Sequence, residues 1–226
     1  MIKQSLCAFS ITACVALAAC SHDTTQPDEY SGFLGDYSRL EEGKSASGAP
    51  VLRWVDPAID AARYTSVYIE PSQLYPKPQA TEKIPQATLV GITNYYDQAL
   101  KNEFSKSLTL AKGPGPNTLI IRPAITAISS SAQSLRAYEV IPIALVAAAV
   151  STASGIRDED TSLSTEAAFL DADSGKVIAQ VVRKGAGAVL ENSSQVMTAK
   201  DAKAVVDGWA ADMFKSYLSL KTKSGS

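Results

Sequence analysis

Two stretches of the chain repeat apolar residues every three or four positions, which is the spacing of an amphipathic helix. The first opens at Pro85, and its apolar stripe comprises Leu89, Ile92, Tyr96, Leu100, Phe104 and Leu108. The second stripe comprises Ala202, Val205, Trp209, Met213 and Phe214 or Tyr217. Thr198 and Asp201 precede it with the spacing of a loose capping box. Each helix is predicted to bury one face against a core.

A period of two marks the predicted strands. Apolar and polar residues alternate over residues 63–70, and residues 118–128 form a second strand that contains Pro123. Because proline lacks an amide hydrogen, Pro123 is expected at a sheet edge or on a bulge. Residues 161–170 and 176–184 are two further strands, and the turn-rich spacer DADSG between them predicts a β-hairpin.

The order of these elements is strand, helix, strand, insert, hairpin and helix. It predicts a single α+β domain over residues 31–220, in which two amphipathic helices cover one face of a mainly antiparallel sheet. Residues 221–226 are predicted to form a polar C-terminal tail. Within the insert, residues 141–150 carry no polar side chain, and Pro142 is placed for a first helical turn. A short apolar helix is predicted there, too short to cross a bilayer.

Two interpretations of this apolar helix are open. A helix that is apolar all round is normally buried, here against the sheet. Alternatively, its side chains form a surface for a partner or one wall of a lipid-binding cleft, since an exposed apolar patch requires a function. The side chains of this candidate surface are Ile141, Ile143, Leu145, Val146 and Val150.

The first 19 residues have the organisation of a secretory signal. Lys3 supplies a positive charge, and residues 6–19 are almost wholly apolar or small, a stretch too short to span a membrane. The stretch ends in Leu17-Ala18-Ala19-Cys20, which resembles the bacterial lipobox. The resemblance implies that Cys20 becomes the mature N-terminus, with diacylglycerol on its thiol and an acyl group on its amine. Residues 20–30 are then the lipidated cysteine and a flexible tether.

An ordinary secretory signal with an incidental cysteine is the competing interpretation. If Cys20 is lipidated, its acyl chains are enough for stable membrane anchoring. In the lipoprotein sorting scheme that the motif resembles, an aspartate directly after the cysteine favours the inner membrane, and this chain has Ser21 there. We therefore expect anchoring in the outer membrane, with the domain facing the periplasm.

Cysteine and histidine are confined to the N-terminal end of the chain. The three cysteines are Cys7, Cys14 and Cys20, and the single histidine is His22. The domain therefore has no disulfide, thiolate zinc site, cysteine nucleophile or histidine-based triad. Residues 1–19 contain one basic residue, Lys3, and no acidic one. Of the 21 basic and 23 acidic residues of the chain, all but Lys3 therefore remain after cleavage. This balance excludes the basic footprint of a nucleic-acid-binding protein.

Three short patterns resemble binding or catalytic motifs without matching them. Residues 171–175 have glycine at the fifth position, whereas an EF-hand requires it at the sixth. Residues 185–187 lack the third glycine of a dinucleotide fingerprint and are expected to be a strand exit. Glu139 and Glu166 are a candidate carboxylate pair for a hydrolase, chosen only because they are acidic and lie near apolar runs. We predict no catalytic residue, metal site or cofactor.

Four stretches carry a family resemblance. They are QPD and YSGFL within residues 26–34, PVLRWVDP at 50–57, YEVIPIALV at 138–146 and VVR at 181–183. Together they closely resemble the YdcL-like lipoproteins, an uncharacterised family of Gram-negative envelopes. The resemblance extends over nearly the whole mature chain, implies a lipid anchor and a single domain, and brings no catalytic residues.

The segment after the tether contains four apolar residues with two open interpretations. Phe33, Leu34, Tyr37 and Leu40 either pin the tether onto the domain or extend the core. Pinning fixes the orientation of the domain relative to the membrane.

The function expected from these patterns is that of a non-enzymatic module, held at the membrane by Cys20, which binds or assembles with another envelope component. That partner is a protein or a lipid, bound at the sheet edge or at residues 141–150. The alternative is a carrier or sensor of a lipid or other hydrophobic ligand, which requires a cleft of several hundred Å³ between sheet and helices. A carboxylate-dependent hydrolase is the third hypothesis.

Overall fold

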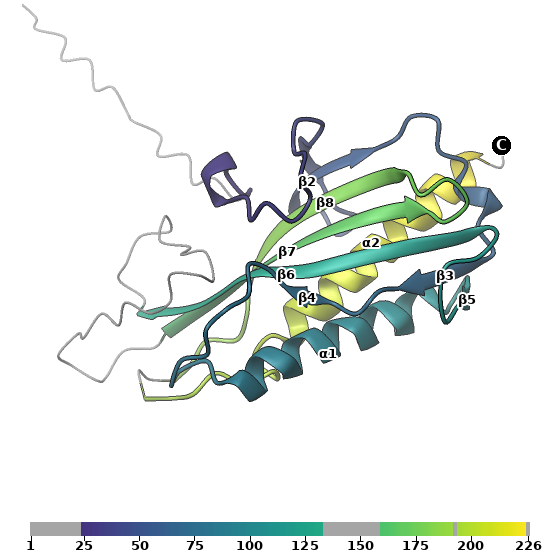
Figure 1. Ribbon diagram of the computed structural model, residues 1–226. Coiled ribbons are helices and arrows are strands. Elements are labelled where there is room, and N and C mark those ends of the chain that lie inside the picture. The colour runs from purple at the N-terminus through teal and green to yellow at the C-terminus, as the bar shows by residue number, and fades with distance from the viewer. Residues whose placement is uncertain (1–23, 133–158, 192–193, 225–226) are drawn as a thin grey trace, which may run out of the picture.

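A mixed β-sheet and two long helices make up the described part of the chain, which comprises residues 24–132, 159–191 and 194–224 of a computed structural model. Among these residues the sheet has eight strands in the order β1-β2-β8-β7-β6-β3-β5, and β4 also pairs with β6 (Figure 1). The strands are β1 (Glu41–Lys44), β2 (Pro50–Val55), β3 (Ser66–Ile69), β4 (Gln73–Leu74), β5 (Thr109–Leu110), β6 (Thr118–Ala132), β7 (Glu159–Asp171) and β8 (Val177–Ala186).

The hairpin of β7 and β8 forms the centre of the sheet, as the sequence predicts. β2 pairs antiparallel with β8 on one side, and β6 pairs antiparallel with β7 on the other. β1 extends the β2 side in antiparallel fashion, whereas β3, β4 and β5 join the β6 side as parallel strands. The expectation of an α+β domain with a mainly antiparallel sheet is therefore confirmed.

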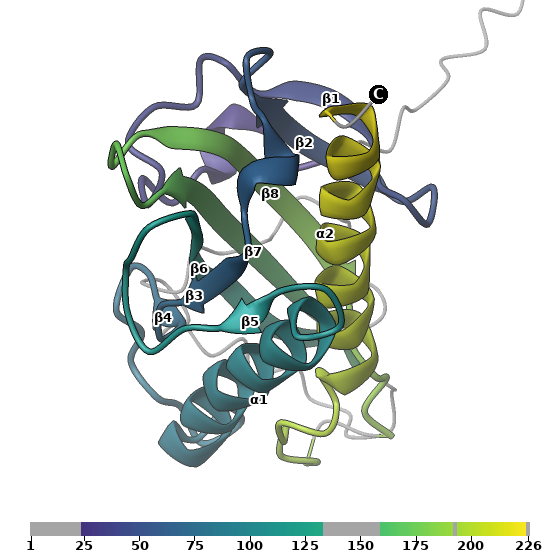
Figure 2. The ribbon, with the colours of Figure 1, turned by 90° about the vertical axis from the view of Figure 1, so that its right-hand side faces the viewer.

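Both long helices cover the same face of the sheet, as predicted (Figure 2). α1 (Gln86–Phe104) begins directly after Pro85, and α2 (Lys203–Ser224) packs beside it. The start of α2 is later than the capping pattern predicts. Thr198 donates its backbone N–H and its hydroxyl to the carboxylate of Asp201, at 2.7 and 2.9 Å. This pair closes a turn ahead of the helix and does not cap the helix itself.

The core lies between the helices and the inner face of the sheet. Tyr96 meets Trp209 with 6.2 Å between ring centroids, and Phe104 meets Phe214 at 5.5 Å. These edge-on contacts between α1 and α2 stabilise the fold beyond the apolar area that the rings bury. Tyr96 is fully buried, and the hydroxyl of Thr165 on β7 donates to its oxygen at 3.1 Å. Burial raises the pKa of Tyr96 to about 12.

Of the two positions predicted for Pro123, the sheet edge is wrong, because β6 is an interior strand, and the bulge of β6 lies between Ile125 and Ala127, just beyond the proline. Pro123 lies in the part of β6 that pairs with β7. On the other side of β6, β3 ends at Ile69 and β4 begins only at Gln73. The neighbouring ladder is thus interrupted near the position where proline lacks an amide hydrogen, which lets an interior strand contain it.

Two boundaries in the structure differ from the predicted ones. α2 continues to Ser224, so residues 221–224 are its last turn and not a tail. At the other end, the chain already contacts β1 at Thr24, within the range predicted as a flexible tether. Residues 24–40, here called the N-terminal strap, cross the face of the sheet opposite to the helices (Figure 1). The predicted apolar helix at residues 141–150 lies outside the described residues.

Candidate functional site

The outer face of the sheet holds a buried carboxyl group, that of Glu166 on β7, beneath the N-terminal strap. Side chains alternate along a strand, so Glu166 points away from its neighbour Ala167, which belongs to the core under the helices. Only 1% of Glu166 is exposed. Its oxygens accept hydrogen bonds from the backbone N–H of Ser31 at 3.0 Å and from the hydroxyl of Tyr37 at 2.6 Å. The strap therefore satisfies a polar group that is costly to bury alone.

Tyr37 also organises the strap itself. Its ring stacks on Tyr30 with 4.3 Å between centroids, and its oxygen accepts a hydrogen bond from the backbone N–H of Gly32 at 2.8 Å. Burial, together with the hydrogen bond to Glu166, raises the pKa of Tyr37 to about 12. The hydroxyl therefore keeps its proton at neutral pH and stays the donor to Glu166.

Further contacts hold the strap along its length. The hydroxyl of Thr24 donates to the carboxylate of Glu42 on β1 at 2.9 Å. Glu29, in the short helix η1 (Pro27–Glu29), forms an ion pair with Lys184 of β8. Leu34 packs against an apolar cluster on the outer face of the sheet, which comprises Ile120, Ala168 and Leu170. These contacts favour the pinning interpretation, since they attach the strap to the outer face and not to the core under the helices.

Glu166 is one half of the carboxylate pair considered for a hydrolase. The other half, Glu139, lies outside the described residues. In the part of the chain that the structure describes, the strap covers Glu166 and occupies both of its oxygens. This geometry gives Glu166 a role in fixing the strap.

A cleft of about 670 Å³ lies on the helix side of the sheet, between α2 and the strands β1, β2 and β8. Figure 2 shows the C-terminal half of α2 beside β1 and β2. At one end of this β2–α2 cleft, the hydroxyl of Ser47 donates to Asp212 at 2.7 Å. At the other end, the backbone N–H of Ala61 donates to Ser224 at 3.2 Å. These two hydrogen bonds attach α2 to neighbouring segments at Asp212 and Ser224, which are 12 residues apart on the helix, about 18 Å at 1.5 Å per residue. The groove lies along this part of α2.

Apolar side chains form the inner walls of the cleft. They are Val51 and Val55 from β2, Ile178 and Val181 from β8, and Met213 and Tyr217 from α2. A volume of about 300–1,000 Å³ with apolar walls and few polar groups is typical of small-molecule sites. The cleft thus has the size and position that the carrier or sensor hypothesis requires.

A buried ion pair lies at the Ser47 end of the cleft. Arg183 of β8 and Asp212 of α2 are 5% and 3% exposed, and 2.9 Å separates Nη2 of Arg183 from Oδ2 of Asp212. Burial favours a higher pKa for Asp212, but hydrogen bonds from Ser47 and Ser45 and the charge of Arg183 outweigh it and hold that pKa below its usual value. The pair joins the sheet to α2 and gives the groove a buried polar end.

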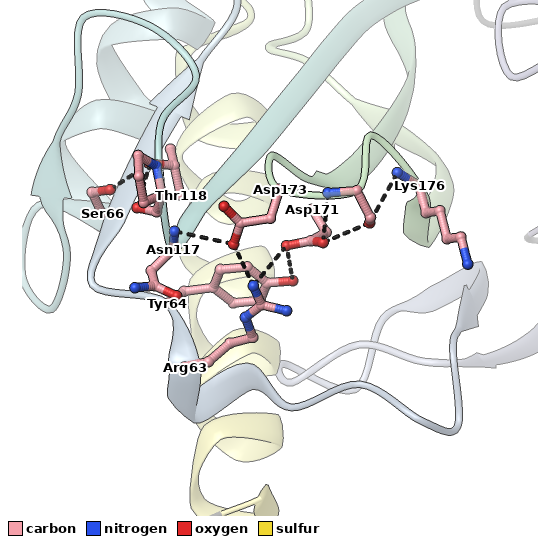
Figure 3. A network of polar contacts seen from close by, with 10 residues as sticks. Arg63, Tyr64, Ser66, Asn117, Thr118, Asp171, Asp173 and Lys176 are labelled. Carbon is pink, nitrogen blue, oxygen red and sulfur yellow. Dashed lines mark hydrogen bonds and ion pairs between the residues drawn. The ribbon is translucent and has the colours of Figure 1, made fainter.

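The turn between β7 and β8 carries a polar network of its own (Figure 3). Asp171 accepts hydrogen bonds from the backbone N–H and hydroxyl of Ser174, at 3.1 and 2.6 Å, and from the hydroxyl of Tyr64 at 3.3 Å. Asp173 forms an ion pair with Arg63 of the short helix η2 (Ala61–Arg63). Protein donors therefore engage both carboxylates. Within the described ranges, no group of three or more His, Cys, Asp or Glu side chains is placed to hold a metal ion.

The glycines of residues 185–187 lie where side chains crowd against β8. A Cβ on Gly185 would lie 2.2 Å from a methyl group of Val205 on α2. A Cβ on Gly187 would lie 2.4 Å from the hydroxyl oxygen of Thr161. The two glycines therefore serve close packing, and neighbouring side chains fill the space that a phosphate would need.

None of the residues of the predicted lipidation site and partner surface belongs to the described part of the chain. Cys20 and the candidate surface of Ile141, Ile143, Leu145, Val146 and Val150 lie outside the described residues, so both stay predictions. Sequence patterns gave no role to Arg183 and Asp212, which are 29 residues apart, although Arg183 lies within the VVR stretch of the family resemblance. Among the described helices, none combines the length and apolar character that a membrane span requires.

Comparison with known proteins assigns the chain to a family. The model of a protein family of unknown function, DUF3313, matches residues 29–213. The chain is 42% identical over 198 residues to the uncharacterized lipoprotein YdcL of Escherichia coli strain K12, with 88% of this chain and 89% of the relative covered. The YdcL protein of Escherichia coli O157:H7 matches to the same extent.

Two solved structures are more distantly similar. A PelC dodecamer from Paraburkholderia phytofirmans matches over 72% of this chain and 96% of that chain, with 11% identity and a TM-score of 0.37. A DUF330 protein from Xanthomonas campestris matches over 76% of this chain and 94% of that chain, with 11% identity and a TM-score of 0.43. The resemblance to YdcL-like lipoproteins is confirmed by the sequence relatives, and the chain belongs to the DUF3313 family of proteins of unknown function.

Proposed function

We propose that this lipoprotein is anchored in the outer membrane through a lipidated Cys20, faces the periplasm, and binds an elongated apolar molecule in the β2–α2 cleft. It acts as a non-enzymatic carrier or sensor. The observation that carries this proposal is the cleft itself, with about 670 Å³ of space and with apolar side chains from β2, β8 and α2 along its inner walls. Its volume is typical of sites that hold small molecules.

The membrane anchor is supported by the lipobox-like sequence Leu17-Ala18-Ala19-Cys20 and by relatives that carry the name lipoprotein. Ser21 supports the outer membrane, because the retention signal of the sorting scheme is an aspartate at that position. Mass spectrometry of the mature chain tests the anchor. We expect an N-terminal Cys20 that carries diacylglycerol and an acyl group, and no such mass in a Cys20→Ser variant. An unmodified wild-type N-terminus would contradict the anchor.

An apolar ligand is supported by the partly exposed apolar side chains of the cleft. Val55, Ile59 and Leu220 line it and are only half-buried, so an occupant of the groove removes apolar surface from water. Each Å² of apolar surface that a ligand removes from water contributes about 25 cal/mol to binding. Met213 adds adaptability, since its unbranched thioether side chain adjusts to the shape of its neighbours.

A binding role is supported over a catalytic one by the state of the buried acidic groups in and near the cleft, Asp212 and Asp171. Asp212 is engaged by Arg183 and Ser47. Asp171 is engaged by Ser174 and Tyr64. A general acid or base needs access to a substrate proton, whereas these groups already serve the fold.

Photolabelling of the lipid-anchored protein tests the proposed ligand class. The full chain is reconstituted in phosphatidylcholine vesicles that contain hexadecanol with a diazirine in its chain, and labelled residues are mapped by mass spectrometry after irradiation. We expect labels on cleft residues such as Val181, Met213 and Tyr217. Labelling restricted to residues outside the cleft would contradict the proposal.

A matched pair of variants on α2 shows whether the labels depend on the cleft. Ser216 lines the cleft and is half-buried, so Ser216→Trp fills the groove and should remove most of the labelling. Thr222 is exposed on the same helix outside the cleft lining, so Thr222→Trp should leave the labelling unchanged. Equal labelling of the wild type and Ser216→Trp would count against binding in the groove.

A further inference from the structure

Basic residues predominate among the exposed charges that line the β2–α2 cleft. Arg53 of β2 and Lys215 of α2 are exposed, and neither forms an ion pair with a carboxylate of the described ranges. Lys44 of β1 also borders the cleft, but it follows Gly43, which faces Arg53, so its side chain points to the other face of the sheet. Lys223 is a third basic residue of the cleft lining, near the end of α2. Positive charges therefore lie on both walls of the groove, on the sheet and on α2.

The acidic residues of the same rim do not cancel these charges. They are Glu41 and Glu42, both on β1. Glu41 lies opposite Arg53 in the β1–β2 register, yet no ion pair joins them. The side chain of Glu42 points to the other face of the sheet, where it accepts the hydrogen bond from Thr24. Inside the cleft, Arg183 and Asp212 neutralise each other. The opening thus keeps an excess of positive charge, which suits an anion.

The strap places this charged opening close to the membrane anchor. Thr24 is fixed by a hydrogen bond of 2.9 Å to Glu42 of β1, the strand that borders the cleft. Thr24 lies only four positions after Cys20. A fully extended chain covers at most about 3.6 Å per residue, so a lipidated Cys20 lies within about 14 Å of Thr24. A short connection of this kind holds the β1 side of the cleft at the bilayer surface.

We propose that the ligand of the cleft is an anionic lipid drawn from the membrane that anchors the chain, with its acyl chain in the groove and its acidic head group at Arg53 and Lys215. The inference rests on the proposed function and specifies its ligand. Apolar walls match the acyl chain, and the basic rim matches the head group. Basic side chains beside a membrane surface attract anionic lipids in the same way.

Two photoactivatable probes of equal chain length test the head group. The lipid-anchored full chain is reconstituted in phosphatidylcholine vesicles that contain either diazirine-bearing hexadecyl sulfate or diazirine-bearing hexadecanol at the same mole fraction. Because one basic residue near an anionic lipid changes binding by about fivefold, we expect the sulfate to label Met213 and Tyr217 at least about fivefold more strongly than the alcohol. Equal labelling by the two probes would overturn the anionic assignment and leave the proposed apolar site standing.

Charge-neutralising variants test whether the preference for the sulfate depends on the basic residues that line the cleft or on the general surface charge. The double variant Arg53→Gln and Lys215→Gln should lose the preference for the sulfate and keep the labelling by the alcohol. The matched control is Lys77→Gln and Lys112→Gln, which removes two exposed lysines outside the cleft lining and should keep the preference. A preference that survives in the first variant, or disappears in the second, would overturn the inference. Cleft labelling by neither probe would overturn the proposed function as well.

Discussion

The hydroxyl of Tyr37 donates a 2.6 Å hydrogen bond to Glu166, across 129 residues of sequence. It joins the strap, which leads back toward Cys20, to β7 at the centre of the sheet. The cleft lies on the opposite side of the same sheet, against α2. In our account the strap thus sets how the domain is oriented at the membrane, while the helix side of the sheet is used for binding.

Tyr37→Phe should reduce the free energy of unfolding by about 1–3 kcal/mol, because it leaves an oxygen of the buried Glu166 without a donor. Urea denaturation followed by circular dichroism measures the change. Tyr75→Phe is the matched control, since Tyr75 is 38% exposed and its hydroxyl has no hydrogen bond to the described residues. Its effect should stay within about 0.5 kcal/mol. Equal effects of the two variants would show that the strap does not depend on the Tyr37–Glu166 contact.

Gly185→Ala should destabilise the fold by about 1–3 kcal/mol, because the added methyl group would lie 2.2 Å from a methyl group of Val205. Combining it with Val205→Ala should restore part of the loss by making room. Gly208→Ala is the control within α2. A Cβ there meets no atom within 4 Å, so the change should stabilise the exposed helix by about 0.5–1 kcal/mol. Thermal unfolding of the three variants measures these differences.

Arg183→Met should cost about 3–5 kcal/mol of stability, because it leaves the carboxylate of Asp212 buried without its cation. The double variant Arg183→Met and Asp212→Leu should recover most of this loss, since no charge is then left buried. Arg122→Met is the control for the loss of an arginine. Its pair with Glu70 is partly exposed, so about 0–1 kcal/mol is expected. A double variant as unstable as Arg183→Met would contradict the pairing.

Stability should fall in acid partly because of Asp212. Its pKa in the folded protein is below the usual value. A carboxyl group with a lowered folded pKa contributes stability that is fully present above its unfolded pKa of about 4 and is lost as the pH falls through the folded pKa. Unfolding free energies measured between pH 7 and pH 2 should therefore decline less steeply for Asp212→Asn than for the wild type. Parallel curves would show that Asp212 does not contribute.

Local patterns predicted the elements whose residues are neighbours in the sequence. The stripe from Leu89 to Phe104 predicted α1, and the DADSG spacer predicted the β7–β8 hairpin, because period and turn chemistry are local properties. Pro123 misled the prediction of where its strand lies in the sheet. Its tolerance in an interior strand depends on β3 and β4 leaving a gap beside it, and no local pattern records such a gap.

The candidate site was less predictable because it is made from distant residues. Ser47 and Asp212 are 165 residues apart, and each belongs to a stretch without a motif. The cleft forms because the β1–β2 edge of the sheet and α2 leave a groove between them, which depends on how two complete layers pack. The attachment of the strap had an indirect signal in the sequence, because Phe33, Leu34 and Tyr37 are more apolar than a flexible tether requires.

Photocrosslinking from inside the cleft, in intact cells, tests the central claim most directly. The photoreactive residue p-benzoylphenylalanine replaces Ser216, which lines the cleft on α2, and the same replacement at Thr222 is the control. After irradiation, mass spectrometry identifies what each position has captured. We predict an adduct of an acidic lipid at position 216 and none at position 222. Only intramolecular or protein adducts at position 216 would contradict the assignment of the cleft as a lipid-binding site.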